Sequence, residues 1–79
     1  MSTQKLANIK LADFERFLRN IGCKNVSIKG GHAKWTKEGL TRPIIFQTHV
    51  DPIPTFIVKT ILKDLGMSPQ DFFDNLKKK

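Results

Sequence analysis

Residues 24–36 read KNVSIKGGHAKWT, two short runs of alternating side chains joined by a pair of glycines. Val26 and Ile28 alternate with polar residues in the first run, and Ala33 and Trp35 do so in the second. Alternation with a period of two is typical of a strand buried on one face, and two glycines suit the tight turn of a hairpin. The stretch therefore predicts two antiparallel strands whose apolar side chains face a core.

A third strand is predicted after this hairpin, where the apolar run Ile44-Ile45-Phe46 begins. The residues expected to point inward are Ile44, Phe46 and Thr48. Those expected to point outward are Ile45, Gln47 and His49. Short turns on both sides make the three strands an antiparallel meander.

Helical spacing of apolar residues predicts helices before and after the sheet. The first stripe covers residues 11–21, and the second covers residues 57–65. A short third helix begins at Ser68, with a proline and an acid at the positions that favour a helix start. The sequence thus predicts an α+β fold: a three-stranded antiparallel sheet with helices packed on one face. We expect a single domain over residues 1–79, with its core at about residues 10–74.

The charge is strongly basic and unevenly placed. The chain has 14 Lys and Arg against 7 Asp and Glu, a net charge of +7. The stretch from Lys24 to Lys37 carries four lysines and no acid, together with His32 and Trp35. A basic surface on so small a chain favours a polyanionic partner, so RNA is the first partner to consider.

Several classes of protein are disfavoured by composition. A single cysteine, Cys23, cannot form an internal disulfide, and with two histidines it cannot complete a structural zinc site. No apolar run approaches the length of a membrane span, and no glycine-rich phosphate loop is present. We expect a cytoplasmic protein with no metal, no cofactor and no membrane association.

The same alternation that sends Ala33 and Trp35 inward places His32 and Lys34 on the opposite, open face of the sheet. Lys29 joins them from the first strand, and Gln47 and His49 join them from the third. Histidine exchanges protons near neutral pH, and lysines stabilise the extra charge of a pentacovalent phosphorane. These residues suit metal-independent cleavage of RNA through its 2′-hydroxyl.

In these features the chain resembles the HicA toxin family, small bacterial RNA endonucleases that are also called mRNA interferases. The resemblance covers roughly residues 10–74. The matching residues are Lys29-Gly30-Gly31-His32-Ala33-Lys34-Trp35, then His49, then Ile61-Leu62-Lys63 and Gly66. Gly31 departs from the family pattern, which has Ser or Thr there, so a hydroxyl group is missing.

The resemblance implies a fold like that of a double-stranded RNA-binding domain and the activity of a hydrolase that cuts mRNA. It implies that His32 is the catalytic residue of a toxin–antitoxin system active in stress responses. It further implies a HicB-type antitoxin that covers the open face, with no oligomer except through that complex. Of the remaining residues, Lys29 and Lys34 are predicted phosphate contacts, and His49 is a possible accessory residue.

Gly30 and Gly31 are predicted to form the turn and to let the backbone approach RNA. Trp35 has two interpretations, a base-stacking platform or a core residue, and its inward direction favours the core.

Two alternative functions stay open. One is a non-catalytic RNA-binding module on the same fold, and the other is a protein-interaction domain that binds an acidic partner.

Overall fold

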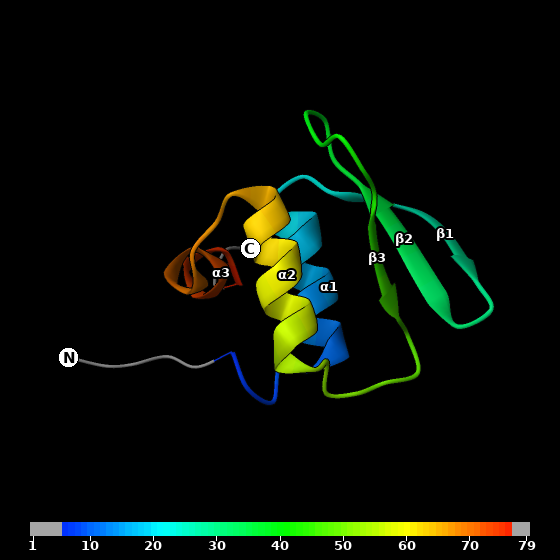
Figure 1. Cartoon of the computed structure of the whole chain (residues 1–79), viewed down its shortest axis with the longest axis horizontal. Helices are drawn as coiled ribbons and strands as arrows, with labels where there is room; N and C mark the ends of the chain where they lie inside the picture. The colour runs from blue at the N-terminus through cyan, green and yellow to red at the C-terminus, as the bar shows by residue number, and fades with distance from the viewer. Residues whose placement is uncertain (1–5, 77–79) are drawn as a thin grey trace.

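The computed structural model describes residues 6–76. Its elements are, in chain order, α1 (Leu11–Asn20), β1 (Lys24–Lys29), β2 (His32–Thr36), β3 (Ile44–Gln47), α2 (Thr55–Leu65) and α3 (Pro69–Leu76). Helices α1 and α2 lie side by side on one face of the sheet, and α3 packs on their far side (Figure 1). The expected α+β fold, with helices on one face and a short C-terminal helix, is confirmed.

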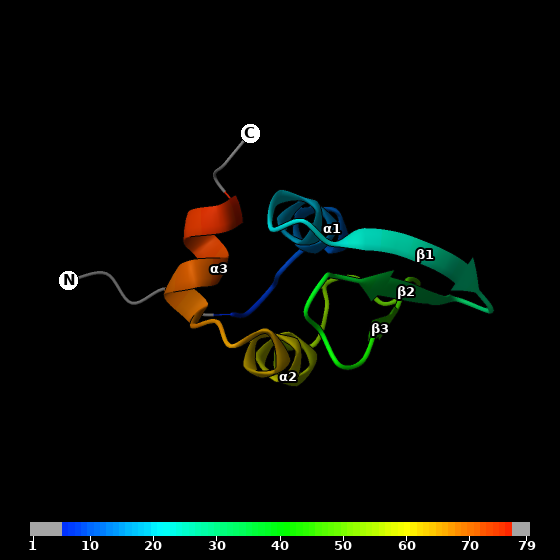
Figure 2. The same cartoon turned by 90° about the horizontal axis from the view of Figure 1, so that it is seen from above.

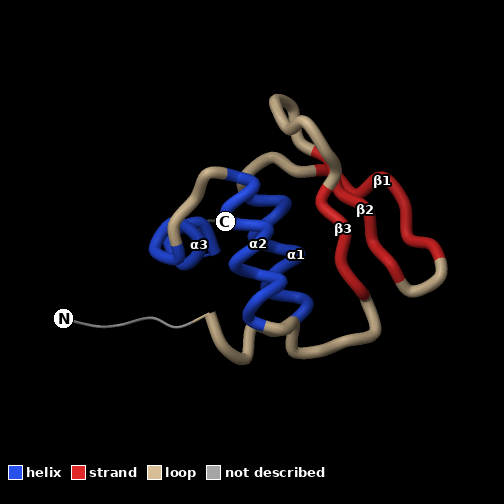
Figure 3. The backbone as a smooth tube through the Cα atoms, in the orientation of Figure 1, coloured by secondary structure: helices blue, strands red, loops and turns tan. Residues whose placement is uncertain are grey.

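The sheet is a meander in the order β1-β2-β3, with both neighbouring pairs antiparallel (Figure 3). Strands β1 and β2 are joined by Gly30 and Gly31, whose φ angles are +61° and +81°. Only glycine adopts this backbone region without a steric cost, so the pair of glycines makes the tight turn possible. The predicted hairpin is therefore confirmed.

Helix α1 is held at its N-terminus by a residue from a distant loop. The backbone N–H of Leu11 donates a hydrogen bond of 3.0 Å to Asp51 Oδ1, and Ile53 pairs with Ile9 in an isolated β-bridge. The first N–H groups of a helix have no partner within it, and a carboxylate there also meets the positive end of the helix dipole. Asp51 thus acts as the N-terminal cap of a helix that begins 40 residues earlier.

Helix α3 begins with the capping box that the sequence predicts. Asp71 N donates to Ser68 Oγ at 3.2 Å, and Ser68 N donates to Asp71 Oδ2 at 2.9 Å. The two residues thereby satisfy two N–H groups reciprocally. Helix α2 ends where predicted, at Gly66, and its last carbonyls accept hydrogen bonds from Gly66 and Met67.

A cluster of phenylalanine rings joins the helices to the sheet. Phe72 of α3 is fully buried, with its ring centroid 4.7 Å from Phe17 and 6.2 Å from Phe14. Phe14 also meets Phe46 of β3 edge to face at 5.2 Å. Burial of such rings contributes most of the stability of a small domain. Trp35 lies in the same core and is 3% exposed, so its assignment to the core is confirmed.

The expected burial of β1 is wrong. Val26 is 55% exposed and Ile28 is 63% exposed. The register between β1 and β2 shifts between Asn25 and Ser27, so Val26 is the extra residue of a β-bulge. Ile28 does face the inner side, opposite Ala33, but this end of β1 runs beyond the helices (Figure 2). Ile28 thus points to the predicted side of the sheet, but none of the helices in the described residues covers this part of β1.

Strand β3 has the inward and outward sides that the sequence predicts, because Ile44 and Phe46 are buried while Ile45 and Gln47 are exposed. The strand ends at Gln47, and His49 lies in the bend that follows. Over residues 6–76, none of the helices has both the length and the apolar character needed to cross a membrane.

Candidate nucleic-acid interface

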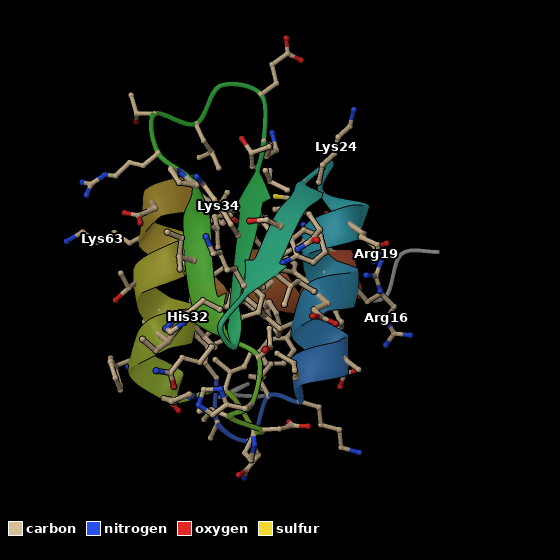
Figure 4. All side chains as sticks on the ribbon, turned by 90° about the vertical axis from the view of Figure 1, so that its right-hand side faces the viewer. Arg16, Arg19, Lys24, His32, Lys34 and Lys63 are labelled. Carbon is tan, nitrogen blue, oxygen red and sulfur yellow. The ribbon has the colours of Figure 1, made fainter. Side chains whose placement is uncertain are left out.

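The strand register assembles two rows of side chains on the open face of the sheet, which Figure 4 views directly. One row runs from Lys29 through His32 to Gln47. The next runs from Ser27 through Lys34 to Ile45. Directly opposed residues of antiparallel strands lie on the same face, about 5 Å apart at Cβ. The structure therefore brings together the predicted residues Lys29, His32 and Lys34.

His32 is exposed at the start of β2, and its ring rests against the glycine turn. Its Nδ1 lies 3.3 Å from the carbonyl oxygen of Gly30. Because a carbonyl oxygen only accepts hydrogen bonds, this contact is a hydrogen bond in the tautomer that carries its proton on Nδ1. In the neutral ring, Nε2 is then the nitrogen with a free lone pair, able to take a proton from a ligand and return it.

Lys29 and Lys34 are exposed, and neither is neutralised by an acid in the described part of the chain. The ion pair found among residues 6–76 joins Arg16 to Asp13 at 3.3 Å, on α1 and away from the sheet face. Lys34 stands out from the middle of the face, whereas Lys63 lies on α2 (Figure 4). Two unpaired ammonium groups beside one imidazole are suited to a phosphate group.

The second histidine, His49, lies against the same turn. The carbonyl of Gly31 accepts two hydrogen bonds from Thr48, at 2.7 Å from its N–H and 3.1 Å from its hydroxyl. This anchors the start of the bend that contains His49 and directs its ring against Gly31. His32 and His49 therefore lie against successive residues of one turn, as neighbours in space although 17 residues separate them in the sequence.

An apolar groove of about 240 Å³ opens beside His32, between β3 and α2. Its walls include Ile45, which is 54% exposed, and Phe56, which is 67% exposed. His32 and Gln47 also line the groove. Strand alternation predicted the outward direction of Ile45, whereas the exposure of Phe56 was not predicted. The available signal was that Phe56 is an aromatic residue placed off the buried stripe of its helix.

Cys23 lies apart from this face. It is buried, and burial raises the pKa of its thiol, while the charge of Lys37 opposes the shift weakly. A neutral buried thiol is a poor nucleophile, so Cys23 acts as a small core residue.

A family model described as the HicA toxin of bacterial toxin–antitoxin systems matches residues 12–67, which is more than half of the chain. None of the curated proteins compared with the chain matches it. The matched range runs from α1 to the end of α2 and includes all three strands, both histidines and both lysines of the candidate interface.

Proposed function

Because this chain belongs to the HicA toxin family, we propose that it is a ribonuclease toxin that binds mRNA on the open face of its sheet. His32 is the group that transfers a proton during cleavage, and Lys29 and Lys34 hold the RNA backbone. The observation that carries this proposal is the row Lys29–His32–Gln47 with Lys34 beside it. In this arrangement an exposed imidazole has two cations beside it, and neither cation has an acidic partner in the described part of the chain.

These groups are sufficient for cleavage through the 2′-hydroxyl of RNA. The 2′-oxygen attacks the adjacent phosphorus and loses its proton, and the bond from phosphorus to the 5′-oxygen breaks as that oxygen gains a proton. His32 makes one of the two proton transfers and solvent water makes the other, while the lysines stabilise the additional negative charge of the phosphorane. The expected products carry a 2′,3′-cyclic phosphate, or the 3′-phosphate derived from it, and a 5′-hydroxyl.

The decisive experiment compares the wild-type protein with His32→Ala on labelled RNA in the presence of EDTA. A general acid or base contributes about 10²- to 10⁴-fold to a rate, so we expect His32→Ala to lose activity within that range. Lys63→Ala is the matched control, because it removes a cation from α2 and leaves the sheet face intact. A His32→Ala protein that still cuts RNA and still arrests growth contradicts the proposal.

The family also implies a cognate antitoxin. We propose a HicB-type protein that covers the open face and blocks access to His32, in the cytoplasm where mRNA is translated. An acidic partner surface would complement a face that carries Lys29 and Lys34. Expression of the toxin with and without the neighbouring reading frame tests this directly. Growth arrest that the neighbour does not relieve excludes that neighbour as the antitoxin.

The same measurements separate the two alternative functions. A non-catalytic module would bind RNA in a salt-sensitive manner and yield no products. A protein-interaction domain would bind its acidic partner tightly and show negligible affinity for any RNA.

A further inference from the structure

The groove between β3 and α2 exposes two large apolar side chains, Ile45 and Phe56, which the core leaves uncovered. Phe56 lies in the first turn of α2, whose buried residues are Val58, Ile61 and Leu62. It therefore faces away from the core, and two thirds of its surface is in contact with solvent. One exposed phenylalanine is ordinary in a small protein, but here it shares a groove with exposed Ile45.

The groove is continuous with the proposed catalytic residue. His32 itself lines it, and Gln47, its partner across the sheet, lines it as well. The groove thus has apolar walls on both sides, from α2 and from Ile45 of β3, and two polar side chains on the side of the sheet. Figure 4 shows His32 on that side, next to the first turns of α2.

We propose that this groove binds one base of the RNA, next to the phosphate held at His32, with the ring of Phe56 stacked on that base. The inference rests on the proposed function, because the phosphate at His32 is what places a base within reach. A base has an apolar face and a polar edge, which matches the groove: Phe56 and Ile45 meet the face, and the carboxamide of Gln47 meets the edge.

RNA is favoured over a segment of a protein partner as the occupant. Lys29 and Lys34 continue the site away from the groove as a positively charged track, which an RNA backbone follows and an apolar peptide does not. Stacking is also the usual way in which single-stranded RNA is read once its bases are splayed out. The groove thereby adds one base-binding position to a basic face whose lysines contact only the RNA backbone.

The test measures binding of short RNAs in which one nucleotide at a time is abasic, with a 2′-deoxy group at the cleaved nucleotide to prevent cutting. We expect Phe56→Ala to weaken binding of the intact RNA about tenfold, which is a typical loss for one stacked base. We expect one abasic position to weaken wild-type binding equally and to cause no further loss in Phe56→Ala. Phe56→Trp should restore the affinity, because it restores a stacking surface.

Ile28→Ala is the matched control, because Ile28 is equally exposed and apolar but lies on β1, outside the groove. Its RNA affinity should stay within twofold of wild type. The inference is overturned if the losses from Phe56→Ala and from every abasic position simply add. It is also overturned if Phe56→Ala weakens only the complex with the antitoxin, since the groove would then be a protein-docking site.

The outcome for the groove is separable from the outcome for catalysis. If the wild-type protein cuts no RNA, the proposed function fails, and scanning abasic positions along the bound RNA still shows whether one base depends on Phe56. If His32→Ala abolishes cleavage and Phe56→Ala changes neither affinity nor cleavage position, the function stands and the groove inference fails.

Discussion

His49 occupies the space into which a side chain at Gly31 would project: a Cβ added there would lie 2.8 Å from His49 Nδ1 and 3.2 Å from its Cε1. The serine or threonine that the family pattern has at this position therefore cannot be introduced with His49 in its present place. The glycine and the position of the histidine ring are coupled features of this chain.

The first prediction concerns Gly31→Ser. The positive φ at Gly31 costs a non-glycine residue about 1 kcal/mol, so the free energy of unfolding should fall by about that amount. Because His49 is exposed, its ring should rotate away rather than disrupt the fold. Urea unfolding measures the first effect, and the NMR signals of the His49 ring report the second.

Gly30→Ser is the control for this prediction, because Gly30 also has a positive φ but an added Cβ there meets nothing within 4 Å. It should lose similar stability and leave the His49 signals unchanged. Equal displacement of the His49 ring by both variants would contradict the coupling between Gly31 and His49.

The second prediction concerns the two lysines of the interface. Each phosphate contact releases about one counterion, so the negative slope of log affinity against log salt concentration should become less steep by about one in Lys29→Ala and in Lys34→Ala. Lys63→Ala should leave the slope unchanged. Fluorescence anisotropy with a labelled RNA over a series of salt concentrations measures all three variants.

The third prediction concerns the cap on α1. Asp51→Ala removes the acceptor of the Leu11 N–H and should destabilise the protein by about 1 kcal/mol. Asp51→Asn keeps an oxygen acceptor and should lose less stability than Asp51→Ala. The stability that Asp51→Asn still loses relative to wild type measures the contribution of the carboxylate charge at the helix terminus. If thermal unfolding shows Asp51→Ala to be as stable as wild type, the capping role is excluded.

The fourth prediction concerns Cys23. Burial raises the pKa of its thiol, so the folded protein favours the neutral form. This contribution to stability is complete below the ordinary pKa of a free thiol and declines as the pH rises above it. At neutral pH, a thiol reagent should label the native protein far more slowly than the protein in urea. Rapid labelling of the native state would show that Cys23 is accessible.

Local patterns in the sequence were enough to predict the order of elements, the glycine turn and the capping box at Ser68. They also placed Lys29, His32 and Lys34 on one face, because the strand period alone decides which side a residue takes. The exposure of Ile28 could not be predicted in this way. Its side of the sheet follows from alternation, but its coverage depends on where the helix layer ends in space.

The groove illustrates the same limit. Phe56 and His32 are 24 residues apart in the sequence and belong to different elements, and their shared groove results from the packing of α2 against the edge of β3. The contact of His49 with Gly31 likewise depends on the path of a bend. Periodicity describes single elements, whereas these features arise between elements.

The position of Phe72 has a consequence for synthesis of the protein. Its ring packs against the rings of Phe14 and Phe17, which are made more than fifty residues earlier. A chain that is still growing on the ribosome therefore leaves the rings of Phe14 and Phe17 without this partner until Phe72 has been added, and it cannot complete its core before then. The aromatic core is therefore completed only after α3 has been made, long after the helix that carries its first two rings.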